Sequence, residues 1–272
     1  MNRFNTYLVN GSFDQAISPI DRGFAYGDGI FRTMLMRNSL PDHWPFHYQK
    51  LVADCAAIGI VCPSAELLIS DLQQLFAIDE IAVAKIVITR GEGARGYAPP
   101  AVTTPMRVVI KSPMPQYSVN HIVNGVNLHV CDIRLAHQPK LAGIKHLNRL
   151  ENVMARMEWH DEHIFDGLLL DQLGNVIECT MSNVFVRFGD TLITPDLSLC
   201  GVAGITRQHI LGLADVLGLS MVVSHLTLEA LLKADEVVIC NSLYGAFQVS
   251  QIGEVIMSKQ HLAKTIRSAL KL

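Results

Sequence analysis

The chain has 272 residues, half of them hydrophobic and 17% charged, with a formal net charge of −3. This is the composition of a folded globular protein with enough residues for one large domain or two ordinary ones, and it excludes a disordered chain. The absence of a long basic run argues against nucleic acid or an anionic membrane surface as the main partner. No apolar run is long enough to span a bilayer, and the first residues lack the apolar segment of a signal peptide.

The cysteines are scattered and include no CxxC pair, which argues against a zinc site or a disulfide framework. We therefore expect buried thiols in a reducing cytoplasm. The six are Cys55, Cys62, Cys131, Cys179, Cys200 and Cys240.

The first half of the chain contains both strand and helix patterns. Spacing and turn residues predict, in order, a hairpin over 6–16, a strand and turn over 31–41, helices over 46–59 and 64–78, and strands over 81–90 and 105–112. The strand over 81–90 is nearly apolar throughout, which is typical of a strand buried on both faces. Two prolines in a polar stretch near residues 112–121 indicate a boundary between domains 1–115 and 116–272.

The second half is predicted to contain more strands than helices. The expected strands cover 125–135, 166–171, 175–179, 183–188, 191–194, 221–225 and 236–241, and the expected helices cover 149–160, 205–217, 227–234 and 259–270. Because strands and helices do not alternate regularly, we expect two α/β (α+β) lobes with a cleft between them.

The sequence "GEGARG", residues 91–96, matches the G-x-G-x-x-G pattern of dinucleotide-binding proteins. That interpretation requires a helix opening at the last glycine, and the prolines of the following "YAPPAVTTP" exclude one. A glycine-rich loop that carries Arg95 is better suited to holding an anionic group, although an ordinary flexible turn has the same pattern.

Lys145, in "LAGIKHLNRLENV", has two interpretations. In one helix over 141–157, Leu150 and Met154 would share the apolar face and Lys145 would point to water. Asn148 followed by Glu151 instead has the spacing of a helix N-cap and its partner, which would place Lys145 in an extended segment before the helix. The helical register alone leaves both open.

The same segment closely resembles the lysine segment of aminodeoxychorismate lyases. These belong to the fold-type IV enzymes that use pyridoxal 5′-phosphate, together with branched-chain and D-amino-acid aminotransferases. Further segments resemble the family in its own order, which makes the set specific. They are "DRGFAYGDGIFRT", "ITRGEGARGYA", "VIECTMSNVF", "GVAGITRQ" and "ADEVVICNSL".

The resemblance implies roles for residues that contact the cofactor. Lys145 would form the Schiff base with the cofactor. A free lysine amine, with a pKa near 10.4, is a poor nucleophile and base at neutral pH, and imine formation and burial overcome this. Glu178 would face the pyridine nitrogen, although strand alternation alone allows it to point to solvent. Lys50 stands where the family usually has an arginine that grips the phosphate. The remaining proposed cofactor ligands are Gly204, Ile205 and Thr206 at a helix start, and Asn241 and Ser242 after a strand.

Substrate-binding residues are also implied by the resemblance. Arg95 and Tyr97 would contact substrate carboxylates, and Tyr26 and Thr33 would line the cleft. Locally, Tyr26 could equally be core packing, and Thr206 could simply cap its helix. His160 and His163 have i, i+3 spacing without a third ligand, so we expect no metal there.

The activity implied by the resemblance is a cytoplasmic, homodimeric lyase that takes a small-molecule substrate and forms 4-aminobenzoate for folate synthesis. Two alternatives are a fold-type IV aminotransferase and a non-catalytic protein that binds pyridoxal phosphate. The wording "KHLNRLEN" favours the lyase, and an intact Lys145 and Glu178 argue against the non-catalytic protein.

Overall fold

The computed structural model of the chain describes residues 6–257 and 261–270. Contacts within the chain define two units. Unit 1 runs to Pro115 and also includes Lys145–Asn148, whereas unit 2 comprises Gln116–Ile144 and the chain from Arg149 onward. Both units combine strands with helices, so the predicted mixed α/β class is confirmed. Within the described ranges, every helix is too short or too polar to cross a membrane.

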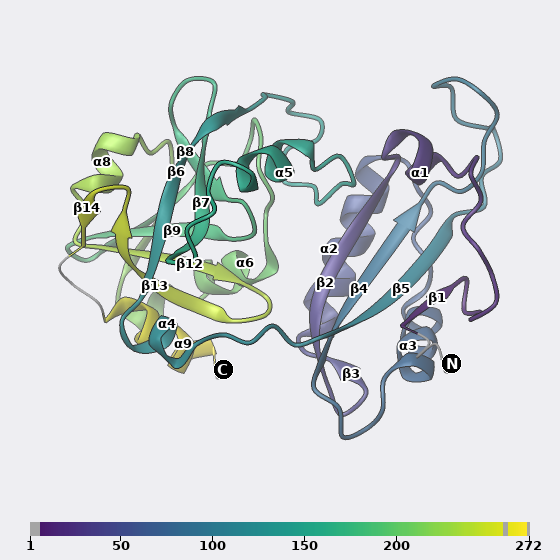
Figure 1. The fold of residues 1–272 in the computed structure, drawn as a ribbon, viewed down its shortest axis with the longest axis horizontal. Coiled ribbons are helices and arrows are strands. Elements are labelled where there is room, and N and C mark those ends of the chain that lie inside the picture. Colours follow the sequence, from purple (N-terminus) through teal and green to yellow (C-terminus); the bar gives the residue numbers. More distant parts are fainter. Residues whose placement is uncertain (1–5, 258–260, 271–272) are drawn as a thin grey trace. The chain divides into compact units, whose positions relative to one another are not determined.

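Unit 1 is built on a five-stranded antiparallel sheet with the strand order β1-β5-β4-β2-β3 (Figure 1). Helix α2 packs against β2, and helix α3 packs against β1, β3 and β5. The elements are β1 (Tyr7–Val9), α1 (Arg22–Tyr26), β2 (Gly29–Arg37), β3 (Leu40–Pro41), α2 (Trp44–Ala57), α3 (Ala65–Leu75), β4 (Ala82–Thr89) and β5 (Met106–Pro113).

The segment Lys145–Asn148 is part of unit 1 because it pairs with the edge of β2. The amide of Phe31 donates to the carbonyl of Lys145 at 2.9 Å, and the amide of Leu147 donates to the carbonyl of Gly29 at 3.0 Å. The side-chain amide of Asn148 donates to the carbonyl of Gly27 at 3.3 Å. Gly27 has a positive φ of 68°, and a Cβ atom there would lie only 2.4 Å from the Asn148 Oδ1 atom, so a larger residue would displace the Asn148 amide. Lys145 therefore lies in an extended segment.

The helix that follows, α5 (Leu150–Arg156), begins later than either interpretation of the sequence required. Arg149 occupies the N-cap position, so the prediction that Asn148 caps this helix is wrong. The amide of Asn148 is engaged with Gly27, and the Glu151 carboxylate accepts instead from the amide of Ala136 at 2.9 Å.

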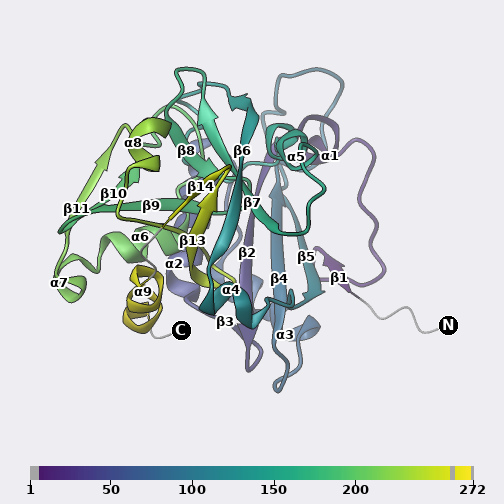
Figure 2. The ribbon, with the colours of Figure 1, turned by 60° about the vertical axis from the view of Figure 1, so that its left-hand side comes forward.

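Unit 2 contains a nine-stranded mixed sheet (Figure 2). Its path is β11-β10-β9-β12-β13-β6-β7-β8, and β14 pairs with β13. The pairs β10–β11, β13–β6 and β6–β7 are parallel. The strands are β6 (Val126–Leu135), β7 (Ile164–Asp171), β8 (Val176–Cys179), β9 (Asn183–Phe188), β10 (Thr191–Pro195), β11 (Ser220–Ser224), β12 (Glu236–Asn241), β13 (Gly245–Ile252) and β14 (Val255–Ile256). The other helices are α4 (Val119–Val123), α6 (Ile205–Leu211), α7 (Ala214–Leu217), α8 (Leu228–Leu232) and α9 (Leu262–Leu270).

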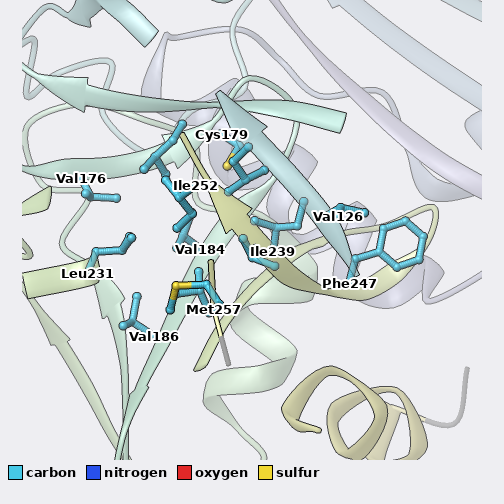
Figure 3. Close-up of a cluster of buried hydrophobic side chains, with 14 of the residues drawn as sticks. Val126, Val176, Cys179, Val184, Val186, Leu231, Ile239, Phe247, Ile252 and Met257 are labelled. Carbon is cyan, nitrogen blue, oxygen red and sulfur yellow. The ribbon is translucent and has the colours of Figure 1, made fainter. Parts of the chain in front are cut away.

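The central strands of unit 2 are buried on both faces, which explains their nearly continuous apolar sequences. Along β9, Val184 and Val186 point into one core cluster, which also contains Phe247 (Figure 3). Phe185, between them, points into a second cluster with Ile210 and residues of α9. Strand β8 joins this framework through β7, and this placement fixes its central residues within the interior.

Two further sequence predictions differ from the structure. The turn at Asn10–Gly11 forms with positive φ at both residues, but β1 pairs with β5, and the described residues 13–18 form no returning strand. The helix predicted over 205–217 is divided, because α6 ends at Gly212, whose amide bonds to the carbonyls of the last turn. Strands β13 and β14 and helices α1 and α4 were not predicted. The start predicted for the last helix, residue 259, lies outside the described residues.

Candidate functional site

Lys145 lies half-buried on the face of the unit 1 sheet that carries Phe31. Its Nζ atom is 4.7 Å from the centre of the Phe31 ring, and the Nζ atom of Lys85, on β4, is 4.6 Å from the same ring. Thr33 is opposite Lys85 in the β2–β4 register and is also half-buried. Strand pairing therefore brings two amines and a hydroxyl-bearing residue around one aromatic ring. Lys85 was not among the predicted site residues.

The carboxylate of Asp54 on α2 connects several cationic and backbone groups of unit 1. Its Oδ1 atom accepts from the Nζ atom of Lys50, its neighbour one helical turn earlier, and its Oδ2 atom accepts from the guanidinium of Arg32 on β2. The amide of Lys145 also donates to Oδ2, at 3.4 Å. Asp54 and Arg32 are 1% and 3% exposed. The predicted phosphate ligand Lys50 and the predicted reactive Lys145 thus share one buried carboxylate.

This cluster has a surplus of positive charge in a poorly hydrated place. Burial lowers the pKa of Lys50 below the ordinary lysine value, and Asp54 opposes that shift. Burial likewise lowers the pKa of Arg32, again against the effect of Asp54. Two cations and one carboxylate leave one positive charge, which suits a phosphate group. In this respect the residues of unit 1 fit pyridoxal phosphate.

Arg32 and Asp54 were not predicted as site residues, but the sequence carried a signal for both. Arg32 occupies the same face of β2 as the buried residues Ile30 and Met34. Asp54 occupies the same face of α2 as the buried Leu51. A charged residue at an apolar position of a periodic pattern is costly to bury unless it is paired, so it points to a specific interaction.

The loop that carries Arg95 and Tyr97 is exposed and lies against α1. The amide of Gly96 donates to the hydroxyl of Tyr26 at 3.2 Å, and the rings of Tyr26 and Tyr97 are 5.5 Å apart. Tyr26 is 37% exposed, so its interpretation as core packing is wrong. In agreement with the exclusion of a dinucleotide site, the described residues 91–105 contain no helix.

Arg22 fixes this loop through the backbone. Its guanidinium donates to the carbonyl of Gly96 at 3.0 Å and of Tyr97 at 2.8 Å, and its Nε atom donates to Asp28 at 2.8 Å. Arg90 donates to the same carboxylate at 2.7 and 2.9 Å. Burial alone would raise the pKa of Asp28, but the two arginines outweigh it and lower that pKa. Arg22 was missed because its role is visible only in the folded loop.

Glu178 lies in β8 and is 4% exposed, so the interpretation as a solvent-facing strand residue is wrong. Its Oε2 atom accepts from the amide of Val202 at 2.8 Å. Gly201 has a positive φ of 84°, and a Cβ atom there would lie 2.6 Å from Ile177 and 3.6 Å from the Glu178 carboxyl carbon. A close turn over 201–202 therefore presses against a buried carboxylate.

Asn183 of β9 holds the next part of this turn. Its Oδ1 atom accepts from the amide of Gly204 at 3.1 Å, and its Nδ2 atom donates to the carbonyl of Val202 at 2.8 Å. Gly204 is the N-cap residue of α6, and Thr206 lies buried within the first turn. Capping by the Thr206 hydroxyl therefore does not occur. The predicted residues Gly204, Ile205 and Thr206 thus form a turn braced by Asn183, which was not predicted.

Asn241 ends β12 and organises the turn to β13. Its Oδ1 atom accepts from the amides of Leu243 and Tyr244 at 3.0 and 3.2 Å, and its Nδ2 atom donates to the carbonyl of Met181 at 3.3 Å. Ser242 is half-buried in the same turn. The side chain of Asn241 therefore stabilises the turn that presents Ser242.

His160 and His163 are both exposed. A different set, His129, Cys131 and Glu158, brings its ligand atoms within 4.8 Å of one another. The Glu158 carboxylate, however, accepts from two successive backbone amides in the bulged part of β6, at 2.6 and 3.0 Å. Burial raises the pKa of Cys131 to about 12, which keeps the thiol protonated. We interpret this set as a brace for the bulge.

Comparison with known proteins gives consistent matches over most of the chain. Residues 29–252 match the family model described as amino-transferase class IV. The chain is 37% identical to an aminodeoxychorismate lyase of Vibrio harveyi, over 90% of this chain and 91% of that protein. It is 30% identical to a D-alanine aminotransferase of Bacillus licheniformis, over 98% and 95%. The crystal structure of 4-amino-4-deoxychorismate lyase from Pseudomonas aeruginosa superposes with a TM-score of 0.92 at 40% identity, covering 97% of this chain and 98% of that chain.

The Arg22 contacts predict how the Arg95 loop responds to a substitution. Arg22→Met removes charge-assisted bonds to two loop carbonyls, each contributing about 1.5–3 kcal/mol. Tryptic cleavage after Arg95 should then become about tenfold faster or more, measured by limited proteolysis with mass spectrometry. Arg37→Met is the control. It removes an exposed arginine at the end of β2, which pairs with Asp42 and not with the loop, and it should leave this rate unchanged. Equal cleavage in the Arg22 variant and the wild type would show that Arg22 does not hold the loop.

Proposed function

Because the chain belongs to the amino-transferase class IV family, whose members depend on pyridoxal 5′-phosphate, we propose that it is a 4-amino-4-deoxychorismate lyase. This enzyme releases pyruvate and forms 4-aminobenzoate for folate biosynthesis. Relatives with that name align over nine-tenths of the chain at 37% and 40% identity. The observation in the fold that carries the proposal is a half-buried Lys145 beside a buried cluster with surplus positive charge.

Lys145 is proposed to bind the cofactor covalently and to move the proton in the reaction. Its backbone is fixed by β2, so the amine is presented from a rigid strand edge. Lys50 is the proposed phosphate ligand in place of the family arginine, as a point charge without the planar two-pronged contact.

Residues of unit 2 have proposed roles at the ring and the phosphate. The buried carboxylate of Glu178 would keep the pyridine nitrogen protonated. Gly204, Ile205 and Thr206 would offer backbone amides and a hydroxyl to the phosphate. Ser242 would contact the phosphate or substrate, whereas the bonds of Asn241 support a role in presenting Ser242.

The substrate carries two carboxylates, and the exposed Arg95 is proposed to bind one of them. Tyr97 lies in the same loop, and Tyr26 contacts the loop through its hydroxyl. Thr33, beside the Phe31 ring, would line the substrate site. A guanidinium on a clamped loop can pair with a carboxylate at small entropic cost.

When bound, pyridoxal phosphate supplies an electron-withdrawing ring that stabilises negative charge at the carbon bearing the substrate amine. Lys145 would remove the proton from that carbon. The enolpyruvyl group on the neighbouring carbon would then leave as pyruvate, and aromatisation of the ring would make the elimination effectively irreversible.

A second candidate function is amino-group transfer, because a D-alanine aminotransferase is 30% identical over 98% of the chain. Lys145 would then return the proton to the cofactor instead of expelling a leaving group. The two functions differ in their products: the lyase releases pyruvate without an added amino acceptor.

The chain is also proposed to form a cytoplasmic homodimer. Helix α5 presents an exposed apolar face, on which Leu150, Met154 and Met157 are 75%, 56% and 69% exposed. A face of this kind is typical of a protein interface. All six cysteines are free thiols, which supports a reducing compartment.

The first prediction from the proposed function tests the cofactor and the reaction together. Borohydride reduction of the purified protein should fix pyridoxal phosphate on Lys145, and peptide mapping locates the label. In a separate assay with 4-amino-4-deoxychorismate, the wild type should release pyruvate and 4-aminobenzoate in equal amounts. Lys145→Arg should lose the label and the lyase activity, whereas Lys85→Arg, which changes the other amine at the Phe31 ring, should keep the label. A label on another lysine would contradict the assignment, and rapid conversion of D-alanine with 2-oxoglutarate instead would favour the aminotransferase.

A second prediction concerns Arg95. Because Arg95 is assigned to the substrate, Arg95→Ala should lower kcat/KM roughly 10²-fold, or about 2.7 kcal/mol of transition-state binding. The visible spectrum of the bound cofactor should stay the same, as should both properties in Arg37→Ala. Loss of the cofactor from the Arg95 variant would instead assign the loop to the phosphate.

A third prediction concerns assembly. If α5 forms the subunit contact, Met154→Glu combined with Met157→Glu should convert the dimer to a monomer, because carboxylates would be buried without partners. Leu173→Glu places a charge on an apolar residue that is 75% exposed in the β7–β8 turn, and should leave the dimer intact. Light scattering distinguishes the two masses. A wild type that is monomeric at assay concentration would refute the homodimer.

A further inference from the structure

Lys50 has a neighbour that should weaken it as an anion ligand. Asp54, one helical turn later, accepts from its Nζ atom, and the side chains are 18% and 2% exposed. A lysine paired only with a buried carboxylate would form a neutral unit, and the carboxylate would repel an incoming phosphate. Position 50 therefore needs another positive charge if it is to hold a dianion.

Arg32 supplies that charge from the neighbouring strand. It pairs with the other oxygen of Asp54, so the carboxylate is shared between two cations. Asp54 and Arg32 both act on Lys50, and the three side chains together carry one positive charge. Without Arg32 the sum would be zero.

Packing alone does not account for Arg32. The side chain is 4% exposed on a strand face shared with Ile30, Met34 and Met36, where an apolar residue would fit the pattern. Its Nε atom is buried and has no hydrogen-bond partner within the described ranges. Such an unsatisfied donor costs about 1–3 kcal/mol, so the residue is expected to serve a purpose other than stability.

We propose that Arg32 is a positioning residue: by sharing Asp54 with Lys50, it leaves the cluster with one net positive charge toward the phosphate group of the cofactor. Arg32 itself is too buried to contact a ligand and acts through Asp54. This inference rests on the proposed function, in which Lys50 contacts the phosphate. It also accounts for a lysine where the family has an arginine: the guanidinium lies one layer deeper, on β2.

The test compares the affinity of the cofactor-free protein for pyridoxal phosphate with its affinity for pyridoxal, which lacks the phosphate. The ratio of the two isolates the phosphate contribution. Arg32→Met makes the cluster neutral and should lower the ratio about tenfold or more, as Lys50→Ala does. Arg32→Lys keeps the charge and should keep most of the preference. The double variant Arg32→Met/Asp54→Asn again has one positive charge, from Lys50, and should recover the ratio.

A structural role for Arg32 would not predict that the affinity ratio recovers when the buried carboxylate of Asp54 is removed as well. The control is Arg107→Met, since Arg107 of β5 pairs with the buried Asp71 of α3 at 2.5 Å in the same unit. Arg107→Met should lower the free energy of unfolding and leave the ratio unchanged. The proposal is overturned if Arg32→Met keeps the wild-type ratio, if the double variant does not recover it, or if Arg107→Met lowers it equally. A wild type that does not prefer pyridoxal phosphate, or is not labelled at Lys145, would instead refute the proposed function.

Discussion

Two backbone hydrogen bonds between β2 and the segment Lys145–Leu147 determine where the proposed reactive amine lies. They hold four residues on unit 1, although the chain on either side belongs to unit 2. In a strand, successive side chains point to opposite faces, so pairing with β2 directs Lys145 toward Phe31. Had α5, which begins at Leu150, begun at Lys145 or earlier, Lys145 would be a helical side chain with a different direction.

The segment Lys145–Leu147 also contributes a donor to the charged cluster in the interior of unit 1. Asp54 is buried, yet each of its oxygens has a cationic partner, and the amide of Lys145 adds a further donor. Burying a charge is costly unless it is paired in this way. In unit 2, buried polar side chains are also hydrogen-bonded: Glu178 and Asn183 accept hydrogen bonds from backbone amides of the turn before α6. In both units, buried polar side chains fix the backbone that carries the candidate ligands.

The sequence was sufficient for elements whose signal is local. The apolar run of β4, the helical spacing of α2 and α3, and the proline-rich segment after "GEGARG" each predicted what the structure contains. The predictions failed where a distant partner decides. The turn at Asn10–Gly11 was recognised, but β1 pairs with β5, in which Val108 is the partner of Val9. Asn148 has the pattern of a cap, but its amide is used by Gly27, a residue that only tertiary structure brings near.

The candidate site divides in the same manner. The family resemblance supplied Lys145, Lys50 and Glu178, whose roles remain proposals. Arg32, Asp54, Arg22 and Asn183 were not predicted, because each acts through a residue far away in sequence. Alternation along β2 did mark Arg32 as a charge at an apolar position, but only the packing of α2 on β2 supplies Asp54 as its partner.

Hydrogen exchange of individual amides tests the pairing of Lys145–Leu147 with β2 most directly. The amides of Phe31 and Leu147 are the donors of the two bonds, so both should exchange slowly, with protection comparable to that of Ile86 in the centre of β4. Exchange of these two amides at the rate of the exposed residues Tyr97 and Ala98 would contradict the pairing, and with it the placement of Lys145 on the edge of β2.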